Sequence, residues 1–196
     1  MNAPGDAPQN YDADLRRHAE EQIARQHAVL SGIARIFREA LTCQTAEELG
    51  RVCLAVAEEV TQSKFGFIGE INVQTGRLDG IAISDPGWDA CRMQTPSGQG
   101  RRPPIDFDIR GIYGRVLLDS RGFFTNDPPS HPDSIGTPAG HPPLRAFLGV
   151  PLFHADKTIG MIGLGNRERG YGPEELEAAE ALAPAIVQAF VSKRAE

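Results

Sequence analysis

The spacing of apolar residues changes along the chain, and this change constrains the fold more than any other feature. Segments near both ends place apolar residues at three- and four-residue steps, which predicts amphipathic helices. Between them, residues 65–73 with 78–84 and residues 146–153 with 159–165 form paired strand-like runs joined by turns. The pattern predicts an α+β fold: one antiparallel sheet, with N- and C-terminal helices on one face.

The first helix is predicted to begin at Asp14, after a frayed start over residues 1–12 that is rich in Pro, Gly, Asn and Asp. Its apolar positions are Leu15, Ala19, Ile23, Leu30, Ile33, Phe37 and Leu41. Thr45 and Glu48 are spaced as a capping box, which predicts a second helix beginning there. Gly172 and Pro173 predict the start of the last helix.

The part of the first helix before Leu30 is charged and thinly apolar, so it has little to bury against its own domain. We therefore expect residues 1–27 to form a disordered start and a projecting helix, residues 28–193 one domain, and residues 194–196 a tail. A helix of this kind pairs with another chain. The expected assembly is a homodimer through a bundle of residues 14–43 and 173–193.

Two long connections are predicted to cover the other face of the sheet. Residues 85–104 are expected to be irregular, and residues 105–117 have the spacing of an amphipathic helix. Residues 127–143 hold six prolines and two glycines. Loops of that length inside a domain are usually functional or disordered. We therefore expect a pocket, covered by this loop and helix, between them and the sheet.

Composition narrows the class of partner and the location. The chain of 196 residues has 26 Asp and Glu against 20 Lys and Arg, a net charge of -6, which argues against nucleic-acid binding. No apolar stretch is long enough for a membrane span, and the opening residues do not resemble a secretory signal. The three cysteines contain no CxxC pair and suit a reducing compartment, so a cytoplasmic location is expected.

The predicted pocket is expected to bind a small molecule. The sequence identifies neither this ligand nor a cofactor. Apolar walls with a few polar groups are typical of such sites. The predicted ligand-binding residues are Ser84, Trp88, Cys91, Ile109, Ile112, Tyr113, Val116, Asn126, Asp127, His131 and His141. The alternative is that the aromatic and aliphatic members of this set simply fill the core beneath the loop.

Several segments resemble the GAF domains of bacterial signalling proteins, over residues 29–191. The run Gly149-Val-Pro-Leu with residues 159–164 is similar to the GAF sheet core, and residues 166–175 to the junction before its final helix. Residues 124–133 and 140–149 are similar to GAF modules of sensor histidine kinases and diguanylate cyclases. The resemblance implies a sensory module of a signal-transduction system, such as a two-component system, with any catalytic output in a separate domain.

Two rival functions follow from the same resemblance. One is an enzyme similar to free methionine sulfoxide reductases, which need pocket cysteines that form a disulfide. Cys43 and Cys53 are expected on the paired N-terminal helices, and only Cys91 approaches the pocket, where it lacks a resolving thiol. We therefore expect that the chain has no catalytic residue and is not an enzyme. The other rival is a dimerisation scaffold that binds no ligand.

Charged and metal-binding side chains offer alternative readings of the same loops and helices. His131, Asp133 and His141 offer ligand atoms for a metal or for haem, but their spacing matches no known site, and hydrogen bonding within the loop is expected instead. Arg167 precedes the acids that start the last helix in a degenerate version of a cyclic-nucleotide GAF signature. A structural pairing of Arg167 with those acids is expected. Arg110 and Arg115 are expected on a solvated face.

Overall fold

The computed structural model describes residues 7–90 and 103–195. Its centre is a five-stranded antiparallel sheet with the strand order β2-β1-β5-β4-β3. The strands are β1 (Phe65–Ile71), β2 (Leu78–Ile83), β3 (Phe123–Thr125), β4 (Phe147–His154) and β5 (Lys157–Gly165). Both predicted hairpins are present, as β1–β2 and β4–β5, and they meet along the central β1–β5 pair. The predicted α+β class is confirmed.

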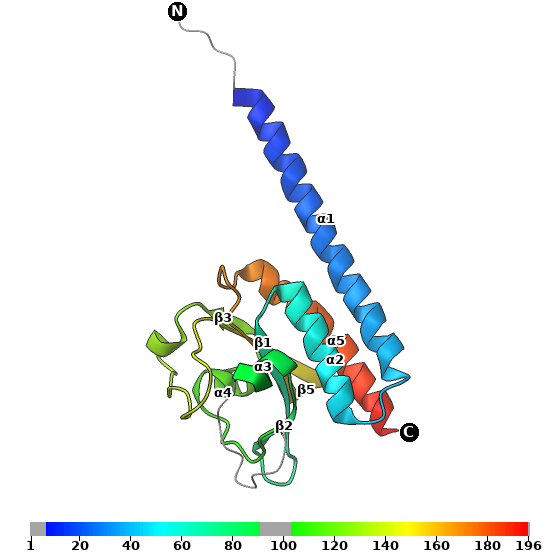
Figure 1. Ribbon diagram of the computed structural model, residues 1–196, viewed down its shortest axis with the longest axis vertical. Coiled ribbons are helices and arrows are strands. Elements are labelled where there is room, and N and C mark those ends of the chain that lie inside the picture. The colour runs from blue at the N-terminus through cyan, green and yellow to red at the C-terminus, as the bar shows by residue number, and fades with distance from the viewer. Residues whose placement is uncertain (1–6, 91–102, 196) are drawn as a thin grey trace, which may run out of the picture.

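The helices divide between the two faces of this sheet. The three long helices α1 (Ala7–Ala40), α2 (Ala46–Thr61) and α5 (Pro173–Arg194) lie together on one side (Figure 1). The short helix α4 (Gly111–Leu118) lies on the other. The remaining elements are α3 (Asp85–Ala90), which follows β2, and the 3-10 turn η1 (Pro128–Ser130).

Local sequence signals explain where two helices begin. The Thr45 hydroxyl accepts the Glu48 N–H at 3.1 Å, and the Glu48 carboxylate accepts the Thr45 N–H at 3.4 Å. The predicted capping box is therefore confirmed. At the start of α5, the Glu175 carboxylate accepts the Gly172 N–H at 2.8 Å, and Pro173 occupies the first turn, where it loses no helical hydrogen bond.

Each face of the sheet carries its own apolar cluster. The larger cluster lies between the sheet and α1, α2 and α5, and its largest fully buried members include Leu54, Ile68, Leu148 and Leu182. The smaller cluster lies between the opposite face and α4 and is built around Val116, Phe147 and Met161. Burial of these side chains supplies most of the free energy that holds the two layers on the sheet.

Helix α1 presents two apolar stripes, one toward the domain and one toward solvent. One stripe packs on the domain: Gly32 and Ile36 are buried, and Ile33 is partly buried. A side chain at Gly32 would meet Val56 at 2.6 Å, so glycine allows α1 to approach α2 closely. The other stripe contains Ile23, Leu30 and Phe37 and is exposed. Because helix residues advance about 100° each, the stripes are about 100° apart.

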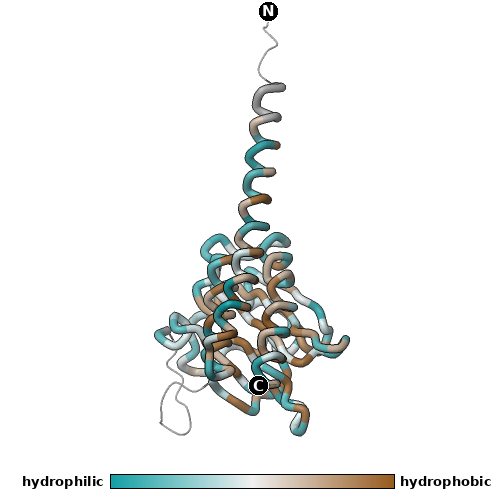
Figure 2. Tube along the Cα trace, turned by 90° about the vertical axis from the view of Figure 1, so that its right-hand side faces the viewer, coloured by the Kyte–Doolittle hydropathy of each residue, from teal (hydrophilic) through white to brown (hydrophobic). Residues whose placement is uncertain are grey.

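The N-terminal part of α1 stands clear of the rest of the protein (Figures 1 and 2). The helix begins at Ala7, so the prediction that it starts at Asp14 was wrong for residues 7–13. Residues 1–6, whose frayed state was predicted, lie outside the described residues.

The segment between β2 and β3 differs from the prediction at both ends. Residues 85–90, expected to be irregular, form α3, with Pro86 in the first turn where it is tolerated. Helix α4 begins at Gly111 and not at residue 105. The cause is that Asp106 and Gly111 have φ angles of 65° and 69°, and Phe107 exchanges two 2.9 Å backbone hydrogen bonds with Leu78. Left-handed residues and strand-like pairing are both incompatible with a continuous helix.

Pro151 illustrates how β4 accommodates a residue without an N–H donor. Its strand lies between β5 and β3, but β3 pairs only with residues 147–149. Pro151 therefore lies beyond the last β3 partner, and a β-bulge follows between Leu152 and Phe153. An unpaired edge or a neighbouring bulge is where a strand tolerates a proline. Over the part of the chain that the structure describes, no helix combines the length and apolar character that a membrane crossing requires.

Candidate functional site

The apolar residues predicted to line a pocket lie together on the α4 face of the sheet. Ile109, Ile112, Tyr113 and Val116 all belong to the smaller apolar cluster. Val116 is fully buried, and the Tyr113 hydroxyl donates to the carbonyl oxygen of Asp108. Burial raises the pKa of Tyr113, so the phenol keeps its proton. These contacts are those of a packed core, which is the alternative that the sequence left open.

Aromatic rings fill the space beneath α4 because glycines lie directly beside them, one on the same strand and one on the neighbouring strand. A side chain at Gly149 would lie 2.8 Å from the Phe147 ring, and one at Gly163 would overlap the Phe67 ring. The Phe147 and Phe123 rings are 5.7 Å apart and tilted by 55°. The absence of Cβ atoms at Gly149 and Gly163 thus lets large rings lie against the sheet.

The polar members of the predicted set are engaged with the backbone. The buried Ser84 hydroxyl accepts the N–H groups of Gly66 at 3.0 Å and Gly87 at 3.4 Å. Asn126 donates to the Tyr171 carbonyl at 2.9 Å and accepts the Tyr171 N–H at 2.7 Å. Asp127 is exposed and precedes η1. Ser84 and Asn126 therefore connect segments of the chain.

The two predicted histidines lie against different aromatic rings. His131 lies 5.5 Å from the Phe123 ring, and its Nδ1 accepts the Asp133 N–H at 3.2 Å. His141 lies edge-on to Phe65 at 6.5 Å. Among residues 7–90 and 103–195, no three His, Cys, Asp or Glu side chains converge as metal ligands do. Trp88 is half-buried on α3, and Cys91 lies outside the described residues.

A polar junction joins the ends of α2, β3 and β5 to the start of α5. The Tyr171 and Ser63 hydroxyls share a hydrogen bond of 2.8 Å, and Ser63 shares another of 2.6 Å with Thr61. Burial raises the pKa of Tyr171 to about 12, so it remains a neutral phenol. Arg167 pairs with Glu175 at 3.2 Å, with both side chains largely buried. The predicted pairing of Arg167 with an acid of the last helix is confirmed.

Glu58, on α2, is a buried carboxyl group that the sequence did not single out. Its Oε1 atom is buried and has no hydrogen-bond partner among the residues that the structure describes. Burial raises the pKa of Glu58 to about 7, the nearby Ser84 hydroxyl opposes that rise, and the charge of Asp85 adds to it. A charge-bearing residue on an amphipathic helix gives no local signal that it will be desolvated, because the neighbours that bury it come from β2 and α3.

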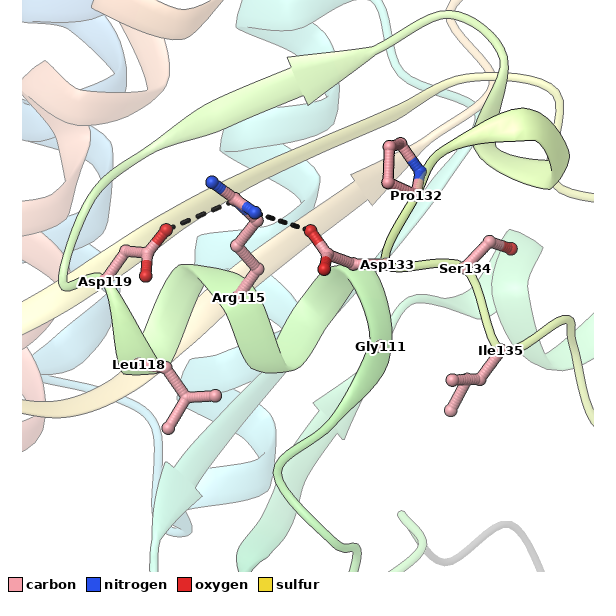
Figure 3. Close-up of a pocket in the computed structure, with 8 residues that line it drawn as sticks. All are labelled: Gly111, Arg115, Leu118, Asp119, Pro132, Asp133, Ser134 and Ile135. Atoms are coloured by element: carbon pink, nitrogen blue, oxygen red, sulfur yellow. Dashed lines mark hydrogen bonds and ion pairs between the residues drawn. The ribbon is translucent and has the colours of Figure 1, made fainter.

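One surface hollow, which we call the α4 hollow, has a cavity volume of about 350 Å³. It is lined by Gly111, Arg115, Leu118, Asp119, Pro132, Asp133, Ser134 and Ile135. Arg115 points between two carboxylates, Asp133 at 2.6 Å and Asp119 at 3.2 Å (Figure 3). These two partners, Asp133 first, raise the pKa of Arg115. The cation is already neutralised, so the α4 hollow is not suited to an anionic ligand.

A second hollow, which we call the sheet-end hollow, lies where β1 begins and β5 ends and has a volume of about 430 Å³. It is lined by Lys64, Phe65, Pro86, Pro142, Pro143, Arg145 and Asn166. Apolar rings form its walls, and its charged lining groups are both cations. None of these residues was predicted as a site residue, although His141, which contacts Phe65, was.

The described cysteines are poorly placed for thiol chemistry. Cys53 is fully buried on α2, and burial raises its pKa to about 12. Cys43 lies in the turn between α1 and α2 and not on a helix as expected, and its pKa is raised, first by burial and then by Glu48 and Glu39. Both are free thiols. A thiol with a raised pKa is a weak nucleophile because little thiolate forms.

Comparison with known proteins agrees with this architecture. A family model for the GAF domain (GAF_2) matches residues 43–191, well over half of the chain. The chain belongs to the GAF domain family. The family resemblance expected from the sequence is therefore confirmed. The match covers the sheet, α2 and nearly all of α5.

Solved GAF structures share the fold at low sequence identity. The GAF domain of a phosphoenolpyruvate-protein phosphotransferase from Coxiella burnetii superposes with a TM-score of 0.67 at 17% identity, covering 86% of this chain and 96% of that one. The free methionine-R-sulfoxide reductase from Neisseria meningitidis, solved with its substrate, gives 0.64 at 16% identity, covering 85% and 90%. Identities this low establish the fold and do not transfer an activity.

A curated relative is the methyl sulfide methyltransferase-associated sensor of Methanosarcina acetivorans, which is 23% identical over 141 residues. The aligned part is 71% of this chain and 14% of that sensor. The GAF chain described here thus spans only a small part of the length of this curated relative.

Proposed function

We propose that this chain is the sensory or regulatory GAF module of a cytoplasmic signal-transduction protein, such as a histidine kinase or diguanylate cyclase. It pairs as a homodimer through α1 and α5 and relays the binding of a small ligand through those helices. The observation that carries the proposal is the second, exposed apolar stripe of α1. The curated sensor relative supports it, and so does the α4 face, where the apolar members of the predicted site gather.

The exposed stripe has the spacing of a helix pairing surface. Ile23, Leu30 and Phe37 are seven residues apart, and Leu41 continues the line. Ile23 and Leu30 are each 65% exposed and Leu41 is 83% exposed. Exposed apolar residues at heptad spacing favour pairing of helices. The nearby cations Arg25 and Arg35 pair within the chain, with Glu174 at 2.5 Å and Glu59 at 3.1 Å.

A route from the predicted ligand face to the dimer helices supports the proposed relay. Asn126 follows β3 at the edge of that face, and its side chain forms two hydrogen bonds with the backbone of Tyr171. Tyr171 precedes α5, which packs against both β4 and α1. A shift of the segment after β3 would therefore move the base of α5, and with it α1.

Placing two aspartates in the exposed stripe, as Ile23→Asp with Leu30→Asp, should abolish the dimer. Burying a carboxylate in an apolar helix interface is strongly unfavourable, so we expect the dimer dissociation constant to rise at least about 100-fold. Sedimentation velocity measures the change. Ala24→Asp with Ser31→Asp is the matched control, since it adds the same charges one residue further along, at exposed positions outside the stripe. A monomeric parent protein, or a double Asp variant that remains dimeric, contradicts the proposal.

The enzymatic alternative rests on the fold shared with methionine-R-sulfoxide reductase. The raised pKa values of Cys43 and Cys53 disfavour thiol chemistry at those positions. We expect the parent protein to reduce free methionine-R-sulfoxide no faster than a variant with all three cysteines replaced by serine, assayed with dithiothreitol. Turnover by the parent that the triple variant lacks would establish the enzyme and refute the purely sensory function.

A further inference from the structure

We propose that the sheet-end hollow binds a small carboxylate that carries an aromatic or similarly flat apolar body. The proposal rests on the sensory function proposed above, names a chemical class of ligand, and adds a binding site separate from the α4 face where the proposed relay begins. It places the ligand at the end of the sheet, between the start of β1 and the segment before β4.

The anion-binding half of the hollow consists of two cations that are free to meet a ligand. Lys64 and Arg145 are exposed, and neither side chain forms an ion pair within the residues that the structure describes. Two other arginines differ: Arg77 pairs with Asp106 and Asp108, and Arg115 with Asp119 and Asp133. No carboxylate belongs to the described lining of the hollow.

The end of β5 fixes the backbone that carries both cations. The Lys64 N–H donates to the Gly165 carbonyl at 2.9 Å, and the Arg145 N–H donates to Asn166 Oδ1 at 2.7 Å. Asn166 has a φ of 61° and donates from Nδ2 to the Pro143 carbonyl at 2.7 Å. A site whose backbone is held in this way loses less conformational entropy when a ligand binds.

The apolar half offers flat surfaces to a ring. Phe65, the first residue of β1, forms one wall, and Pro86, Pro142 and Pro143 complete the walls. His141 contacts the Phe65 ring edge-on and supports it from outside the lining. A volume of about 430 Å³ is in the range of small-molecule sites. Aromatic rings pack well on such surfaces, which disfavours a small hydrated ion as the occupant.

The hydrogen-bond inventory favours a carboxylate over a phosphate. Phosphate sites usually present several free backbone N–H groups. Here the N–H groups of Lys64, Arg145, Ala146 and Asn166 already donate to acceptors within the chain. Within the described lining, the remaining donors are the Lys64 ammonium, the Arg145 guanidinium and the second N–H of the Asn166 amide. A planar carboxylate matches the planar guanidinium.

Benzoate is the probe that tests this assignment, with benzamide as its uncharged isostere and inorganic phosphate as an anion without an apolar body. Titrations of the full chain are followed by calorimetry and by backbone amide chemical shifts. We expect benzoate to bind with shifts centred on residues 64–65 and 142–146, and benzamide to bind at least about tenfold more weakly. Equal affinity for benzoate and benzamide, tighter binding of phosphate than of benzoate, or no binding of benzoate overturns the proposal.

Charge-removing variants locate the site. Lys64→Gln and Arg145→Gln should each weaken benzoate binding about tenfold, because a charged hydrogen bond is lost. Lys157→Gln, at the opposite end of β5, is the matched control and should leave binding unchanged. Benzoate affinity that is unaffected in both site variants refutes the site. The dimer of α1 does not involve these residues, so failure here is distinguishable from failure of the proposed helix pairing.

Discussion

Gly160→Ala should lower the free energy of unfolding by about 3 kcal/mol, as measured by urea denaturation. Gly160 faces Glu70 across the central β1–β5 pair. A Cβ atom there would overlap the carbonyl oxygen of Gly69 and lie 2.9 Å from Glu70 Cα. Both contacts are with backbone, so no side-chain rotation can relieve them, and two paired strands at the centre of the sheet must separate.

Gly76→Ala is the control for Gly160→Ala. It introduces the same methyl group in the β1–β2 turn, where nothing lies within 4 Å, at a φ of 69°. The expected loss is about 1 kcal/mol, from the left-handed backbone alone. Losses of equal size in the two variants would show that crowding at the β1–β5 pair is not what excludes a side chain at Gly160.

The free energy of unfolding of Glu58→Gln, relative to that of the parent protein, should be higher at pH 8 than at pH 5. The pKa of Glu58 is raised from 4.5 to about 7 in the folded protein, so the folded state holds this proton more tightly than the unfolded chain. Its stabilising contribution is complete below about pH 4.5 and is lost as the pH rises through about 7. Glutamine has nothing to ionise and removes that loss.

The expected difference between pH 5 and pH 8 is about 1–2 kcal/mol, after allowance for partial exposure of the group to solvent. Urea denaturation of parent and variant at both pH values measures it. Glu177→Gln, on the exposed side of α5, controls for the loss of one negative charge. If the difference in free energy of unfolding between the parent and Glu58→Gln is the same at both pH values, the pKa of Glu58 is not raised.

Features encoded within a few residues could be predicted from the sequence. The Thr45–Glu48 capping box, the proline at the start of α5 and both hairpins depend on neighbours in the chain, and each is present. The start of α4 could not be predicted in the same way. The Phe107 backbone pairs with Leu78, a residue far away in the sequence, and this pairing replaces the first turns of the helix that the apolar spacing indicated.

The sequence could predict which face of the sheet carries the candidate site. It could not predict whether a cavity exists there. Ile112, Tyr113 and Val116 were placed on the correct side of one helix by their spacing. Whether space remains beside them depends on where the Phe67 and Phe147 rings lie. The Phe67 ring lies against Gly163, its partner across the β1–β5 pair, and the Phe147 ring lies against Gly149, two residues along the same strand. Whether a ligand enters this face stays a prediction.

The sheet-end hollow had no signal in the local sequence pattern. Lys64 and Arg145 each follow loop residues and belong to no periodic run. Their proximity to one hollow follows from the antiparallel pairing of β1, β5 and β4, which brings the start of two strands to the end of the third. Asn166 could be noted as a polar residue directly after a strand, but its left-handed conformation and its three bonds to residues 143–146 emerge only in three dimensions.

The geometry of α1 makes it a mechanical lever arm. The helix runs unbroken for 34 residues, and only its C-terminal part rests on α2 and α5. With a rise of about 1.5 Å per residue, the span from Val29 back to Ala7 is about 33 Å. A tilt of only about 5° at the base therefore swings the Ala7 end by about 3 Å. Movements too small to disturb the packed core around Ile36 would thus be amplified into displacements as large as half a helical turn at the far tip of the arm.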